Sequence, residues 1–288
     1  MSGIRIGAIT DEFSPDIAVA VEAMRELGMK GAELRMVNGK NIMDLTDAEL
    51  DAALAVVRGA GLEVAAIASP LLKCTLPDAP PIDERFQQDV FASKHSFEDQ
   101  PRLAQRAFEI AKRSSARIVR VFSYWRVVDP PAVFERVVDA LQELSDRAAE
   151  HKLIIGIENE HACNIATAHD TARILAAVDQ ENLQVVWDPA NAWVSGEEPF
   201  PGGYQVLESK RIAHVHAKDC RLEGRKPIWC PLGEGDIDWE GQMDALAEDD
   251  YKGFIHLETH WGGPGGNKLE GSKICARNLK RLVAATAL

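Results

Sequence analysis

The chain has 288 residues, of which 46% are hydrophobic and 27% charged. This ordinary globular composition excludes a disordered, collagen-like or coiled-coil chain. The net charge of −13 disfavours a nucleic-acid partner, because an acidic surface repels phosphodiester backbones. No apolar run reaches the roughly 18 residues that a membrane span needs, so we expect no membrane partner either.

The cysteines and the N-terminus indicate where the protein works. The five cysteines are scattered and form no C-x-x-C pair, which argues against a disulfide framework and against a thiolate zinc site. The first residues lead directly into a strand-like run and offer no signal peptide. We therefore expect a cytoplasmic protein, and a homo-oligomer is compatible with these features.

The first half of the chain alternates between strand-like and helix-like segments. The predicted strands are residues 5–9, 31–37, 62–69 and 117–122. Ser14 and Pro15 predict the start of the first helix, and Gly28 its end. A capping box from Thr46 to Glu49 predicts the start of the second helix, and residues 101–112 are predicted to form the third.

The second half repeats this alternation. The predicted strands are residues 153–158, 183–188, 212–216 and 253–258, and the predicted helices include residues 131–152, 167–178 and 272–285. Eight strands in strict alternation with helices favour a parallel sheet that closes on itself. We predict an α/β fold, a (β/α)8 TIM barrel with residues 1–288 as one domain. An open doubly wound sheet is disfavoured because no G-x-G-x-x-G follows the first strand.

Three long connections follow predicted strands, at residues 70–95, 217–237 and 259–271. Connections that follow barrel strands emerge at the C-terminal face, where barrel enzymes place their sites. Because long loops are often lids or binding loops, we expect these three to roof a pocket.

Polar residues recur at the C-terminal ends of the last four predicted strands. The sequence reads IENEH at 157–161, WDPAN at 187–191, HVHAKD at 214–219 and HLETH at 256–260. Glu158, Asp188, His216 and Glu258 therefore reach one level of the barrel. Buried carboxylates need pairing or a metal, and no set of basic partners is obvious on the same strands. Three carboxylates and one imidazole favour a divalent ion such as Mn²⁺, Mg²⁺ or Co²⁺, and Zn²⁺ is compatible.

Residues near these four are candidates for contact with a small-molecule substrate. His214 lies two residues before His216 and so on the same face of the strand, but deeper in the barrel. It is either a residue that contacts the substrate or supports a ligand, or a plain core histidine. The other candidates lie just beyond the strands or on strand four, and they are Glu160, Asn191, Lys218, His260 and Arg120. Glu33 is either a pocket residue or the partner of Arg35 or of another barrel arginine.

These motifs, together with LGEGDIDW at 232–239 and GAELR at 31–35, resemble the sugar phosphate isomerase/epimerase family of xylose isomerase-like barrels. The resemblance implies that Glu158, Asp188, His216 and Glu258 bind one divalent metal and that the two glutamates are an acid/base pair. Ketose epimerases of this group usually have a histidine where this chain has Asn191. The DNA-repair branch of the fold is disfavoured because the strand-six motif lacks its extra histidines.

The predicted chemistry is proton removal beside a carbonyl through a metal-stabilised enediolate, with Glu158 and Glu258 as the catalytic pair. Our first hypothesis is an isomerase or epimerase of a keto sugar, sugar acid or related polyol in carbohydrate metabolism. The alternative is a dehydratase of a cyclic keto-polyol or keto acid, since loss of a β-hydroxyl starts from the same intermediate. A third hypothesis is a non-catalytic barrel that binds a sugar.

Overall fold

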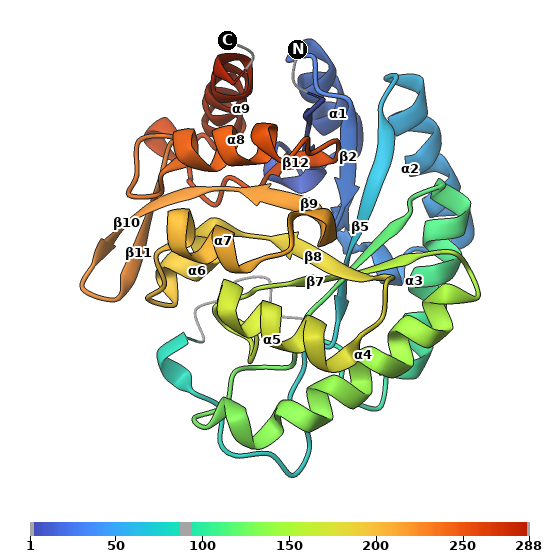
Figure 1. Cartoon of the computed structure of the whole chain (residues 1–288). Helices are drawn as coiled ribbons and strands as arrows, with labels where there is room; N and C mark the ends of the chain where they lie inside the picture. Colours follow the sequence, from blue (N-terminus) through green and yellow to red (C-terminus); the bar gives the residue numbers. More distant parts are fainter. Residues whose placement is uncertain (1–2, 87–93, 287–288) are drawn as a thin grey trace.

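The computed structural model describes residues 3–86 and 94–286, and its centre is a closed barrel of parallel strands surrounded by helices (Figure 1). Around the barrel the strands follow the order β1, β12, β9, β8, β7, β6, β5 and β2. Their bounds are β1 Arg5–Ile9, β2 Gly31–Leu34, β5 Glu63–Leu71, β6 Ile118–Val121, β7 Ile154–Glu158, β8 Leu183–Trp187, β9 Ile212–Ala217 and β12 Phe254–Leu257. The predicted (β/α)8 barrel is confirmed.

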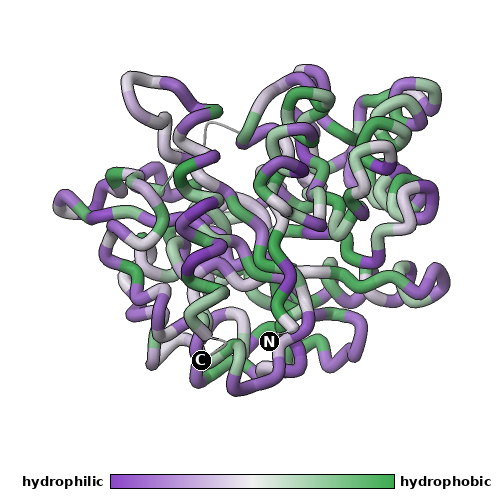
Figure 2. Tube along the Cα trace, turned by 90° about the horizontal axis from the view of Figure 1, so that it is seen from above, coloured by the Kyte–Doolittle hydropathy of each residue, from purple (hydrophilic) through white to green (hydrophobic). Residues whose placement is uncertain are grey.

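The outer layer consists of helices that follow the strands in turn. They are α1 Ile17–Glu26, α2 Asp47–Gly59, α3 Gln100–Ser114, α4 Phe134–Ala149, α5 Ala168–Val178, α6 Pro189–Val194, α7 Tyr204–Val206, α8 Trp239–Glu248 and α9 Lys268–Ala285. Hydrophobic and hydrophilic stretches alternate along these helices because only one side of each packs on the barrel (Figure 2). None of the helices in the described ranges combines the length and the apolar character that crossing a membrane requires.

Two helix starts show how local sequence sets the elements. The predicted capping box of α2 is confirmed, since the Thr46 side chain accepts from the Glu49 backbone and Glu49 accepts from Thr46 in return. The predicted start of α1 at Ser14 is wrong. Asp16 is the N-cap, with its carboxylate accepting from the backbone of Ala18 and Val19, whereas the Ser14 hydroxyl accepts from the backbone of Asp16.

Two segments at the C-terminal ends of barrel strands differ from the prediction. Residues 31–37 do not form one strand, because β2 ends at Leu34 and the chain then forms a small hairpin of β3 (Met36–Val37) and β4 (Lys40–Asn41). The long connection at 217–237 contains a hairpin that the sequence did not predict, formed by β10 (Asp219–Glu223) and β11 (Lys226–Cys230), which projects from the barrel in Figure 1. All five cysteines are unpaired, as expected.

Candidate active site and metal centre

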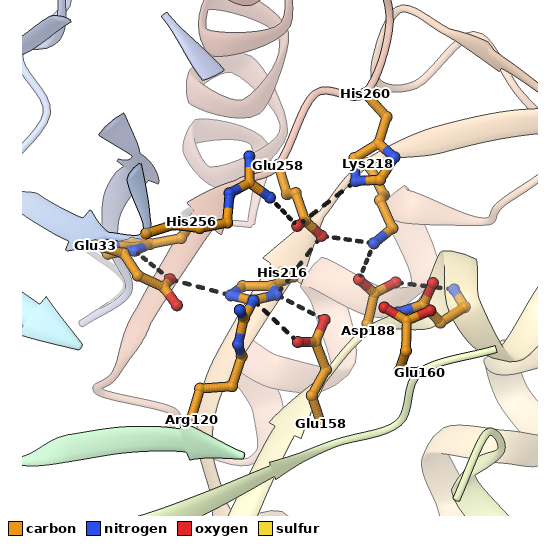
Figure 3. Close-up of polar contacts among 12 residues, drawn as sticks. Glu33, Arg120, Glu158, Glu160, Asp188, His216, Lys218, His256, Glu258 and His260 are labelled. Atoms are coloured by element: carbon orange, nitrogen blue, oxygen red, sulfur yellow. Dashed lines mark hydrogen bonds and ion pairs between the residues drawn. The ribbon is translucent and has the colours of Figure 1, made fainter. Parts of the chain in front are cut away.

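Four acidic or imidazole side chains converge at the C-terminal ends of neighbouring strands. Glu158 ends β7, Asp188 follows β8, His216 lies in β9 and Glu258 follows β12. All four are buried, and one potential ligand atom from each lies within 4.8 Å of the others. We call these four residues the ligand cluster (Figure 3). They are the four for which the sequence predicts metal binding.

The ligand cluster fits a divalent metal by its donor set and by its unused acceptors. It offers three carboxylates and the Nδ1 atom of His216, which lies 3.0 Å from Glu158 Oε1. Glu158 Oε2 and Asp188 Oδ2 are buried and accept no hydrogen bond within the described part of the chain, although each lies in an ion pair, with Arg120 and Lys218 respectively. Buried carboxylates need positive charge, and a divalent cation held among the four ligand atoms would supply it to all three at once.

The carboxylates already have positive partners, although the sequence showed no obvious set of basic partners on the same strands. Lys218 Nζ lies 2.7 Å from Asp188 Oδ2 and 2.6 Å from Glu258 Oε2. Arg35 Nη1 lies 2.9 Å from Glu258 Oε1, and Arg120 Nη1 lies 3.2 Å from Glu158 Oε2. Lys218 directly follows β9. The sequence could not show that its side chain turns between two carboxylates of neighbouring strands.

These contacts give two of the carboxylates opposite pKa shifts. Burial raises the pKa of Asp188 to about 6, although the Lys218 ammonium opposes the rise. Burial also opposes ionisation of Glu258, but Lys218 and His260 outweigh it and lower the pKa of Glu258 well below its usual range. The same ion pairs hold the pKa of Lys218 well above its usual value despite burial, so the ammonium stays charged.

A second buried group lies directly beneath the ligand cluster. Glu33 Oε2, from β2, lies 2.9 Å from His214 Nε2, 3.0 Å from His216 Nε2 and 3.0 Å from His256 Nδ1. We call Glu33, His214 and His256 the histidine layer. Neither sequence alternative for Glu33 holds, because it pairs with these imidazoles and Arg35 pairs instead with Asp11, Glu12 and Glu258.

A cavity of about 370 Å³ opens above the ligand cluster. Of the predicted site residues, Glu258, Arg120, Glu160 and His260 line it. The lining also includes Arg35 and Lys73, and Lys73 Nζ lies 3.3 Å from Glu160 Oε2. Carboxylates and cationic side chains therefore both line the cavity, and two such pairs, Lys73 with Glu160 and Arg35 with Glu258, contact each other in its wall.

The structure does not bring three predicted substrate contacts to this cavity. His214 is fully buried in the histidine layer and faces a separate cavity of about 270 Å³ that residues of the opposite barrel end line. Asn191 is buried, and its Oδ1 lies 2.9 Å from His161 Nδ1. Lys218 does not line the cavity, and its Nζ atom lies between Asp188 and Glu258. The alternation of side chains along a strand determines which face of the sheet a residue lies on, but not how deep in the barrel its side chain ends.

The predicted loops contribute unequally to this cavity. The segment after β5 contributes Lys73, Lys94 and His95, and the segment after β12 contributes His260. The β10–β11 hairpin does not line the cavity and instead packs Trp229 on the His260 ring, with 4.7 Å between ring centroids. The β3–β4 hairpin, which the sequence did not predict, contributes Met36, Lys40 and Asn41.

The family model of xylose isomerase-like TIM barrels matches residues 21–282. The chain belongs to this family. An inosose dehydratase from Lactiplantibacillus plantarum is 24% identical over 197 residues, which are 62% of this chain and 63% of that protein. The match thus spans less than two thirds of the relative's own length.

Two solved structures share the fold at low identity. The IolI protein, solved with a bound zinc atom, is 19% identical with a TM-score of 0.74, and the match covers 99% of both chains. A D-allulose 3-epimerase from Methylomonas sp. is 15% identical with a TM-score of 0.71, covering 98% of this chain and 99% of that one. At these identities the likeness shows the fold alone.

Proposed function

We propose that this chain is a metal-dependent dehydratase of a polyhydroxylated cyclic ketone. One glutamate of the ligand cluster removes the proton on the carbon next to the keto group. The bond between the β-carbon and its hydroxyl oxygen then breaks, and that oxygen leaves as water after it receives a proton. A divalent metal held by the cluster would polarise the keto oxygen and acidify the neighbouring C–H bond.

The observation that carries this proposal is the buried ammonium of Lys218 in contact with Glu258 and Asp188. A departing hydroxyl needs a proton donor, and a charged ammonium beside the catalytic carboxylates is one. Lys218 itself does not line the cavity, but its partner Glu258 does, so the ammonium lies one contact away from the space that a substrate would occupy. The inosose dehydratase similarity supports the same reaction class. Arg120, Glu160 and His260 line the cavity and are suited to bind substrate hydroxyls.

A second candidate is epimerisation or isomerisation of a keto sugar, which the pairing of Glu158 and Glu258 favours. This reaction starts with the same proton removal but returns the proton to carbon. It needs two carboxylates that exchange protons, whereas the pKa of Glu258 is held far below its usual range by Lys218 and His260 against the effect of burial. Dehydration needs, in addition to the base, a proton donor for the departing hydroxyl, and the Lys218 ammonium beside Glu258 is suited to that role, which makes dehydration the better supported reaction.

The test is to incubate the protein, loaded separately with Mn²⁺, Co²⁺, Mg²⁺ and Zn²⁺, with inososes and keto sugars in D₂O. A dehydratase yields a product lighter by one water, whereas an epimerase yields a deuterated product of otherwise unchanged mass. The Lys218→Met variant should still exchange the substrate proton for deuterium but should lose dehydration. Wild-type dehydration by this variant would remove Lys218 from the mechanism. Absence of both exchange and conversion with every metal would overturn the proposal and favour a sugar-binding barrel.

A further inference from the structure

The histidine layer contains a carboxylate oxygen that three imidazoles share. Glu33 Oε2 lies within 3.0 Å of His214, His216 and His256, and all four side chains are fully buried. The second oxygen, Oε1, accepts no hydrogen bond from the described residues. The dehydratase mechanism above uses neither Glu33 nor its two partners in the layer, yet burial of so many polar groups demands a role or a stability cost.

His216 belongs to both groups and uses a different nitrogen for each. Its Nδ1 lies 3.0 Å from Glu158 Oε1 and 3.8 Å from Glu258 Oε2, so it faces the ligand cluster. Its Nε2 lies 3.0 Å from Glu33 Oε2. An imidazole that offers Nδ1 to a cation must keep its hydrogen on Nε2, and Glu33 accepts that hydrogen.

The layer also fixes Glu33 in place. His214 and His256 each direct one nitrogen at Oε2, and their rings meet edge to face with 4.3 Å between centroids. The His256 ring fits only because Gly7 and Gly31 face it. A Cβ atom at those positions would lie 2.3 Å and 2.7 Å from His256 Nε2. The carboxylate therefore has two further donors that stop it from turning away from His216.

We infer that Glu33 is a positioning residue that holds the His216 ring and its Nε2 hydrogen so that Nδ1 is presented to the metal. This inference rests on the metal centre of the proposed function but not on the reaction catalysed. The alternative role for the layer is a second metal site, since Glu33, His214 and His216 also form a group of potential ligands. The arrangement of three nitrogens around one oxygen at hydrogen-bond distances favours hydrogen bonding.

The test measures metal affinity without substrate, by competition with a chromophoric chelator. Glu33→Gln should weaken metal binding about 10–100-fold, the usual cost of losing such an outer partner of a ligating histidine. In a His216→Ala background the same change should cause no further loss, because Glu33 acts only through His216. In the Zn²⁺-loaded wild type, ¹⁵N spectra should show the His216 hydrogen on Nε2, and Glu33→Gln should disturb that signal.

Asp219→Asn is the matched control, because Asp219 is a buried carboxylate that accepts backbone N–H groups of Cys220, Gly233 and Gly235 and contacts none of the four ligands. It should leave metal affinity unchanged even if it lowers stability. Should Glu33→Gln fail to fold, Glu33→Asp tests the same contact, because the shorter carboxylate cannot reach all three imidazoles.

Wild-type metal affinity in Glu33→Gln or Glu33→Asp would overturn the inference. It would also be overturned if Glu33→Gln lowered metal affinity by the same factor in the His216→Ala background as in the wild type. Binding of two ions per chain, with loss of one in Glu33→Gln, would assign the layer as a second metal site instead. A failure to dehydrate any substrate, with these affinities as expected, would contradict the proposed function and leave this inference standing.

Discussion

The ligand cluster and the histidine layer both bury carboxylates around His216, but they stabilise them in different ways. In the ligand cluster the partners are full cations, and two carboxylate oxygens still accept no hydrogen bond. In the layer the partners of Glu33 include His256, whose pKa burial lowers to about 3, and His214, whose pKa burial also lowers. These two imidazoles are therefore neutral donors of fixed geometry.

The difference teaches which of the two regions is built to exchange its contacts. An ion pair depends less on direction than a hydrogen bond does, so another cation can take its place, whereas a carboxylate oxygen with three imidazole nitrogens at hydrogen-bond distance resists rearrangement. The ligand cluster is thus suited to take up a metal and a substrate. The histidine layer is suited to keep its shape while that happens.

The largest expected effect separates catalysis from metal binding in the ligand cluster. With saturating metal, Glu158→Gln and Glu258→Gln should each lower turnover by about 10²–10⁴-fold, because an amide cannot carry the proton. The variant that lacks the base should also lose deuterium exchange into substrate, whereas the other should keep it. Near-normal turnover in either metal-saturated variant would leave that glutamate as a ligand only.

The sequence predicts the positions that depend on order along the chain, but it does not predict the contacts that side chains make across the barrel. The barrel and the four strand-end residues follow from the alternation of elements and from the βα spacing, because strand ends of a parallel barrel lie at one level. Glu33 and Lys218 contact residues on strands across or beside their own. Such contacts depend on barrel closure and side-chain direction, which no local pattern records.

The β3–β4 hairpin was missed for a related reason. MV at 36–37 continues the apolar pattern of GAEL at 31–34, so the sequence shows no break between them. In the structure Arg35 interrupts the run, because its guanidinium turns to Asp11, Glu12 and Glu258. The charged partners that end the strand are far away in sequence, so a local periodicity could not reveal them.

The second effect concerns Lys218 as the internal cation of the ligand cluster. Lys218→Met should destabilise the metal-free protein by about 3–5 kcal/mol, because it leaves buried carboxylates without their partner. Added divalent metal should restore most of that stability, since the ion would neutralise the same buried carboxylates. The measurement is urea unfolding with a chelator and with metal. Lys252→Met is the control, because its ion pair with Asp250 is exposed and contributes only about 0–1 kcal/mol.

If metal failed to stabilise Lys218→Met, the ligand cluster would be as fixed as the histidine layer, and the contrast between the two regions would be wrong.

The third effect tests the histidine layer with a pair of variants at one position. His256→Asn keeps a donor near the Nδ1 position, whereas His256→Leu removes it and leaves Glu33 with two donors. The Leu variant should be less stable than the Asn variant by about 1.5–3 kcal/mol, the usual contribution of a hydrogen bond to a charged group. Because the His256 ring contacts Glu33 and His214 rather than a ligand side chain, and only its backbone pairs with His216, both variants should lose much less metal affinity than Glu33→Gln. A loss of metal affinity in the His256 variants equal to that in Glu33→Gln would mean that the histidine layer acts as one unit.

The smallest effect is a pH dependence that arises where the two regions meet. Burial opposes the charged form of His216, but Glu33 and Glu158 outweigh it and raise its pKa in the metal-free protein well above 6.5. At pH 7 the ring is therefore charged and carries hydrogens on both nitrogens, so a metal that takes Nδ1 must displace one proton. Metal affinity should rise with pH, by about tenfold per unit while one proton is released. Below pH 6 the dependence should steepen, because burial raises the pKa of Asp188 to about 6 and its carboxyl then also gives up a proton.

A pH indicator in weakly buffered solution should record about one proton per metal bound at pH 7, and His216→Gln should release markedly less. Metal binding without proton release would mean that Nδ1 already carries no hydrogen, and that Glu158 does not share His216 with Glu33.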